Sequence, residues 1–159
     1  MSQSSLAWNY AIVRFLPYPE VEEFVSMGAV VACPETRVFD FRIETEQTER
    51  VTRFYPTLDP HLLIAGRDMF VRELARVREC LCGTAASASP TALTKEEFSR
   101  SFCELVKPRE SIFRFGGVGT LLAASAEEAL DHLFSAYVQR RQVYPFRAPQ
   151  SQAVADASG

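Results

Sequence analysis

Arg14 is the residue whose type and position most suggest a chemical role. It shares one face of a strand-like segment with Tyr10, Ile12 and Leu16, because alternate residues of a strand point to the same side. A guanidinium among apolar side chains needs a carboxylate partner or a route to solvent. Glu23 lies across the following turn, where a cross-strand ion pair is geometrically natural. The sequence leaves two interpretations open, a structural ion pair or a ligand-binding arginine, and it favours the ion pair.

A second polar pair belongs to the segment "VFDFRIE". Its residues alternate, so Asp40 and Arg42 point away from the apolar side. If the first three strands form a meander, Asp40 and Arg42 could join the polar face of Arg14. The candidate polar site or structural ion-pair cluster is therefore Arg14, Glu23, Asp40 and Arg42.

The glycine cluster "FGGVGT", residues 115–120, resembles a loop that cradles phosphate. Such a loop places glycines directly before a helix, so that backbone N–H groups and the helix dipole converge on the anion. Here no Gly-Lys-Ser/Thr sequence follows, and the next helix begins only near Ser125. Its first turn carries Glu127 and Glu128, which would repel phosphate. A hairpin turn is the favoured interpretation.

Cysteines and histidines give no recognisable site. Cys80 and Cys82 lie two apart at a predicted helix end, so their side chains diverge by about 200°. His61 and His132 are the only histidines, and neither has a partner motif for nucleophilic catalysis. The sequence contains no zinc-protease, nucleophile-elbow or phosphate-loop motif. We expect packed or weakly exposed thiols, no metal and no cofactor, and the sequence gives no positive support for an enzyme.

Composition narrows the class of protein. The 159 residues are 47% hydrophobic and 23% charged, which is typical of one globular domain. A net charge of −3 argues against a nucleic-acid binder, and acidic residues interleave with the arginines of the segment 60–82. The sequence has no secretory leader and no membrane-spanning run, and its four cysteines are too sparse for a disulfide scaffold. We therefore expect a cytoplasmic protein with reduced thiols.

Strand patterns dominate the first 44 residues. Segments 10–16, 24–33 and 38–44 are rich in aromatic and β-branched residues, and short turns separate them. The second segment is apolar at both odd and even positions, as expected of a strand covered on both faces. Gly28 within it suggests a bulge or a close backbone approach. Shorter strands are predicted at 111–115 and 120–124.

Three helices follow from periodicity and capping. Asp59 as N-cap and Pro60 at the first position begin a helix that runs to residue 82. Thr94 and Glu97 form a capping box for a second helix, which Pro108 ends. A third begins at Ser125. The fold predicted is α+β, an antiparallel β-meander sheet with about three helices packed on one face. A single domain spans 9–141, and 142–159 form a C-terminal tail expected to be disordered at its end.

The segment "NYAIVRFLPYPEVEEFVSMGAVVACPE" resembles the opening of a bacterial family catalogued as domain-of-unknown-function family 3037. Members begin with a tyrosine-containing strand that ends in an arginine, and they continue into a "GEFVNVGVV"-like strand with a "CP" stop. The matching residues are Tyr10, Arg14, Glu23, Phe24, Val25, Gly28, Val30, Val31, Cys33 and Pro34. Glu22, Ser26 and Met27 depart from the pattern, and the family's asparagine is absent. The segment "SAEEALDHLFSAYVQRR" is similar to the family's closing helix, so the resemblance covers about residues 9–141.

The resemblance implies no established activity. Genes of this family often lie beside genes for HipA-like kinases, which implies a protein partner of that kind. Our leading hypothesis is a non-enzymatic binding or accessory module that acts through a protein partner. The alternative is a small-ligand-binding protein or an unrecognised enzyme, with a polar pocket around Arg14, Glu23 and Asp40.

Overall fold

Three consecutive strands form the predicted antiparallel meander. The computed structural model describes residues 4–46, 48–82 and 93–139. In it, β1 (Leu6–Phe15) pairs with β2 (Val25–Cys33), and β2 pairs with β3 (Val38–Ile43). The short strands β4 (Phe113–Phe115) and β5 (Gly119–Ala123) both pair antiparallel with β1. The sheet order is therefore β3, β2, β1 and then β4 with β5 along the far edge.

The glycine cluster between β4 and β5 does not form the predicted hairpin turn. Val13 of β1 pairs with Phe115 and Tyr10 pairs with Gly119, so β4 and β5 run in one direction along one edge. Three residues, Gly116 to Val118, face the two β1 residues between those pairs. The cluster is thus a bulge within an interrupted edge strand, which local sequence cannot distinguish from a turn between two strands.

Gly28 lies beside a β-bulge and also at a close backbone approach, the two features that the sequence suggested. The β1–β2 register shifts between Val13 and Arg14, which leaves Met27 as the extra residue on β2. A Cβ added to Gly28 would lie 2.1 Å from the Arg42 carbonyl oxygen. Glycine is therefore required where β3 approaches β2 closely.

Helices begin where the caps predicted. The elements are η1 (Pro19–Val21), α1 (Glu49–Phe54), α2 (Pro60–Cys82), α3 (Lys95–Leu105), α4 (Ala126–Leu133) and the π-helical turn η2 (Phe134–Val138). Asp59 Oδ1 accepts a hydrogen bond from the His61 backbone N–H at 2.9 Å, and Thr94 and Glu97 form the expected capping box. The sequence analysis missed α1, which is only six residues long.

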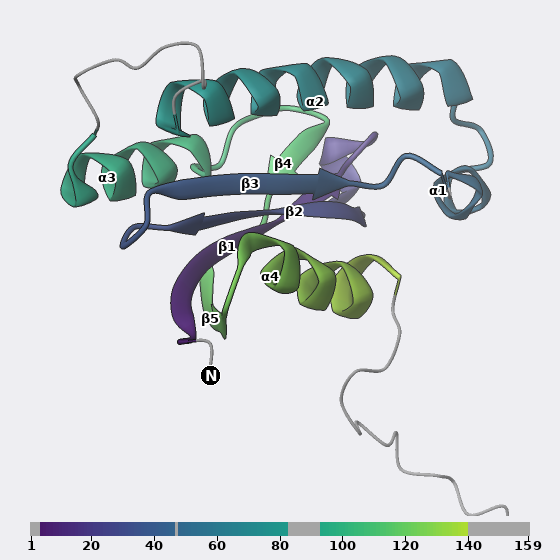
Figure 1. Ribbon diagram of the computed structural model, residues 1–159. Coiled ribbons are helices and arrows are strands. Elements are labelled where there is room, and N and C mark those ends of the chain that lie inside the picture. Colours follow the sequence, from purple (N-terminus) through teal and green to yellow (C-terminus); the bar gives the residue numbers. More distant parts are fainter. Residues whose placement is uncertain (1–3, 47, 83–92, 140–159) are drawn as a thin grey trace, which may run out of the picture.

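The α+β class and the antiparallel sheet are confirmed, but the helices do not all lie on one face. Figure 1 shows α2 and α3 on one side of the sheet and α4 on the other. Met27, Val30 and Ala32 of β2 join the core beneath α2 and α3, and Ala29 and Val31 join the core beneath α4. Because both parities of β2 are apolar, each face needs its own cover. The predicted tail 142–159 lies outside the described residues.

Two side chains form hydrogen bonds that connect elements far apart in the sequence. The indole of Trp8 donates a hydrogen bond to the Ala123 carbonyl at 3.0 Å, which joins β1 to β5. The guanidinium of Arg50, on α1, donates to the carbonyls of Ser26 and Val138. It therefore ties the end of η2 to β2, and it satisfies carbonyl groups that the end of a helix leaves without partners.

Candidate functional site

Arg14 lies near the end of β1, and aromatic and glycine neighbours hold its guanidinium. Its Cζ is 4.2 Å from the centre of the Phe24 ring, a cation–π contact. A Cβ added to Gly116 would lie 3.0 Å from each of Cζ, Nε and Nη2, so Gly116 lies against the flat of the group. Its Nε is buried and has no hydrogen-bond partner among the described residues.

Glu23 is not found as the partner of Arg14. No ion pair joins the two in the described part of the chain. Glu23 acts instead on Tyr55, which belongs to the core beneath α2 and α3. Burial is the main cause that raises the pKa of Tyr55, and the negative charge of Glu23 adds to it. Glu23 therefore has a different neighbour from the one that the sequence suggested.

Asp40 and Arg42 share a face of β3 but have separate partners. Asp40 accepts from Arg78 of α2 at 3.0 Å, and Arg42 donates to Asp131 of α4 at 2.5 Å. Asp40 pairs with Val31 of β2 whereas Arg14 pairs with Ser26, which separates them by about 16 Å along the strand direction. The hollow that Arg14 lines contains neither Glu23 nor Asp40. The four candidate residues therefore do not converge in one pocket.

The pair Asp40–Arg78 helps to close the free edge of β3. The Phe41 backbone N–H donates to Asp40 Oδ1 at 2.9 Å, and the Phe39 N–H donates to Cys82 Sγ at 3.2 Å. Both strand donors are thus occupied by side chains, the second from the last residue of α2. Unpaired strand edges recruit other chains, so this edge is protected against strand addition.

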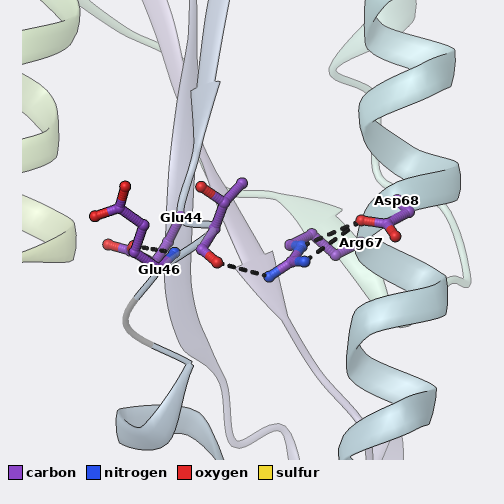
Figure 2. Close-up of polar contacts among 5 residues, drawn as sticks. Glu44, Glu46, Arg67 and Asp68 are labelled. Atoms are coloured by element: carbon purple, nitrogen blue, oxygen red, sulfur yellow. Dashed lines mark hydrogen bonds and ion pairs between the residues drawn. The ribbon is translucent and has the colours of Figure 1, made fainter.

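Arg67 links the middle of α2 to the end of β3 (Figure 2). Its side chain is only 11% exposed. Its Nη1 lies 3.4 Å from the Thr45 carbonyl and its Nε lies 3.4 Å from Asp68 Oδ1, both near the limit of a hydrogen bond. In the same turn the Glu46 N–H donates to Glu44 Oε1 at 3.0 Å. These contacts position α2 over the sheet.

A groove lies between α2, α3 and β4. Its accessible volume is about 540 Å³. The floor is apolar, and it includes Phe70, Val77 and Leu81 of α2 with Leu105 of α3 and Phe113 of β4. The rings of Phe70 and Phe113 stack with centroids 5.3 Å apart, an arrangement that aromatic pairs favour. Its volume and its mainly apolar lining with a few polar groups make this groove a candidate binding site.

Basic side chains outnumber acidic ones around this groove. Four basic residues and two acidic residues line it. Arg76 pairs with Glu73 at 3.4 Å, and Lys107 pairs with Glu104 at 2.6 Å. The remaining two basic residues are Arg109 and Arg114, and neither has an acidic partner among the described residues. The rim is therefore positive on a chain whose net charge is −3.

Helical periodicity alone does not separate the floor of the groove from the core. Phe70, Val77 and Leu81 have helical spacing, but in the structure they are only half-buried, whereas Leu63 and Leu74 are fully buried. The length of α2 was the one signal in the sequence that could have indicated the groove. The 23 residues of α2 span about 35 Å, roughly twice the length of α3. Part of the apolar stripe of α2 therefore extends beyond its neighbour.

Neither a metal centre nor a membrane span is found in residues 4–46, 48–82 and 93–139. No group of three or more metal-ligating side chains occurs there, and no helix is both long and apolar enough to cross a bilayer. His61 is exposed, as are the thiols of Cys80, Cys82 and Cys103.

The fold and the groove define an α+β domain with a candidate binding site, and a comparison of the sequence then identifies its family. The model of the family described as "Protein of unknown function (DUF3037)" matches residues 10–138. The chain belongs to this family. No curated protein and no solved structure matches the chain.

Proposed function

We propose that this protein is a non-enzymatic binding module that holds a protein partner in the groove between α2, α3 and β4. The observation that carries the proposal is an apolar groove with a positive rim on a chain whose net charge is negative. A concave, mainly apolar surface with a few charged groups at its rim is the usual form of a binding site. Two backbone N–H groups at the β3 edge already donate to side chains, Asp40 of β3 and Cys82 of α2, which favours the groove over that strand as the docking surface.

The groove suggests the chemistry of the partner. An amphipathic segment with large apolar side chains would fill the floor, and acidic residues beside them would face Arg109 and Arg114. The resemblance to the family suggests a HipA-like kinase as the first partner to test, in a bacterial cytoplasm. We therefore propose an accessory protein of such a kinase.

Affinity capture from the native host tests the proposal, and co-expression with a HipA-like kinase provides a direct assay. Val77→Asp places a charge on the groove floor, and Met69→Asp makes the same kind of change on the outer side of α2, where Met69 is 69% exposed. We expect Val77→Asp to lose the retained partner and Met69→Asp to keep it. Capture of no partner by the wild type, or equal retention by both variants, contradicts the proposal.

Charge reversal provides a test that leaves the core intact. Arg109 is exposed, so Arg109→Glu should not disturb folding. It should slow association at low ionic strength, and added salt should reduce the difference from the wild type because rim charges act through screened, long-range attraction. Arg53→Glu on α1 is the control, since Arg53 lies outside the groove. An effect of equal size in both variants would show that net charge, and not the groove, controls binding.

A further inference from the structure

The guanidinium of Arg14 is held in place without a hydrogen-bonding partner for its buried nitrogen. The Phe24 ring and Gly116 both lie against the guanidinium, and neither accepts a hydrogen bond from its Nε. A cation–π contact satisfies the charge in part but accepts no N–H hydrogen bond. A buried donor left unsatisfied is costly and calls for an explanation, of which a bound water or ion is one.

A hollow adjoins this guanidinium at the bulge between β4 and β5. Its accessible volume is about 340 Å³, and Arg14, Val106, Lys107, Gly116 and Gly117 are among its lining residues. No aspartate or glutamate lines it. The volume lies at the small end of the range for ligand sites. The charge of the lining is therefore positive, and its walls are apolar or formed by the glycine backbone.

We propose that this hollow binds a carboxylate carried on a small apolar body, with the edge of Arg14 as its principal donor. A planar guanidinium presents parallel N–H groups that match the two oxygens of a carboxylate. Lys107, the other basic residue of the hollow, already pairs with Glu104. One available guanidinium suits a monoanion better than the two charges of a phosphate ester.

This site is distinct from the groove, although the two adjoin. Lys107 and Phe115 line both. The carboxylate could therefore come from a free organic acid or from the C-terminus of a polypeptide. Benzoate represents the first source and an N-acetylated Leu-Val dipeptide with a free C-terminus represents the second. The amide of each probe has the same body without the charge.

Heteronuclear amide NMR on the full chain is the test. We expect one or both carboxylates to shift the amide signals of Gly116 and Gly117 saturably in the millimolar range, while their amides do not. Saturation by benzoate identifies a site for free acids, and saturation by the peptide alone identifies a site for chain ends. If neither carboxylate saturates, or if the amides bind equally well, the proposal is overturned.

Variants locate the effect at Arg14. Arg14→Met should weaken binding by about tenfold or more, because hydrogen bonds to a charged group are lost. Gly116→Ala places a methyl group against the guanidinium and should also weaken binding while Arg14 is retained. Arg53→Met, on α1, is the matched control and should bind as the wild type does, because Arg53 is 83% exposed and lies outside the hollow. Unchanged binding in Arg14→Met and Gly116→Ala would overturn the assignment.

The result does not depend on the proposed partner. Val77→Asp alters the groove, and Val77 does not line the hollow. Carboxylate binding should therefore persist in that variant even where partner binding is lost. If Val77→Asp loses both partner binding and carboxylate binding, the groove and the hollow act as one site. That result would overturn the proposal of a separate carboxylate site.

Discussion

The substitution Gly28→Ala should destabilise the fold strongly, although it adds only one methyl group. The added Cβ would lie 2.1 Å from the Arg42 carbonyl oxygen, 2.8 Å from Ile43 Cδ1 and 2.9 Å from Ile43 Cα. Two of these atoms belong to the backbone, so rotation of a side chain cannot relieve the contact. The β2–β3 ladder must open at the pair Gly28–Ile43.

Overpacking of a well-packed site costs about 1–3 kcal/mol, and the backbone contacts place Gly28→Ala at about 3 kcal/mol. For a domain of this size, that corresponds to a fall in Tm of about 10 °C. Urea unfolding measures the free energy directly. Trp8, the single tryptophan, is a suitable fluorescence probe because it is 2% exposed and bonded to β5. Far-UV circular dichroism should give the same transition if unfolding is two-state.

Gly117→Ala is the matched control. A Cβ at Gly117 meets nothing within 4 Å, so the substitution should change stability by no more than about 1 kcal/mol, and lower chain entropy in the unfolded state could make it stabilising. If the free energies of unfolding of Gly28→Ala and Gly117→Ala agree within experimental error, the close approach of β3 to β2 is wrong. The positions of Asp40 and Arg42 would then be wrong as well.

Three other perturbations test separate parts of the structure. Arg50→Met should cost about 2 kcal/mol in urea unfolding and increase amide exchange in η2, because the Val138 carbonyl loses its donor; unchanged exchange would contradict this contact. Thr94→Ala should cost about 1 kcal/mol through loss of the capping box, and Thr94→Ser should recover most of it; an equal loss in both would mean that the cap is not responsible. Burial, and secondarily Glu23, raises the pKa of Tyr55 above its usual 10.0, so the folded state binds this proton more tightly than the unfolded chain does. Its contribution to stability should be complete below pH 10 and lost as the pH rises through the raised pKa, and Tyr55→Phe should remove this loss; ultraviolet titration showing Tyr55 ionising with the exposed tyrosines would contradict it.

Much of the local structure could be predicted from the sequence because its causes are local. The period-two pattern located the strands of the meander, and Asp59, Pro60 and the capping box at Thr94 located the starts of α2 and α3 to within a residue. Apolar residues at both odd and even positions of β2 also indicated that both faces of this strand are covered. A strand that is apolar on both faces conflicts with the expectation that the helices pack on one face only. In the structure, β2 contributes residues to a core on each face of the sheet.

The candidate site was less predictable. The sequence identified Arg14 as a charge without an obvious purpose, but it suggested Glu23 as the partner because Glu23 is nearby in the chain. The groove was hidden because half-buried Val77 and fully buried Leu74 follow the same helical pattern. Periodicity shows which face of a helix is apolar, but it does not show how far along the helix the neighbouring element reaches.

The sequence by itself determined the class of fold, most of the elements and the residues at which helices begin, since propensity, capping and hydrophobic period act over a few residues. Only the tertiary structure decided that the glycine cluster is a bulge, that Gly116 lies against Arg14, and that Arg42 meets Asp131, 89 positions further along the chain. These contacts depend on strand register and on which faces of the sheet the helices cover. Both are set by the packing of the whole core, for which no short segment carries the information.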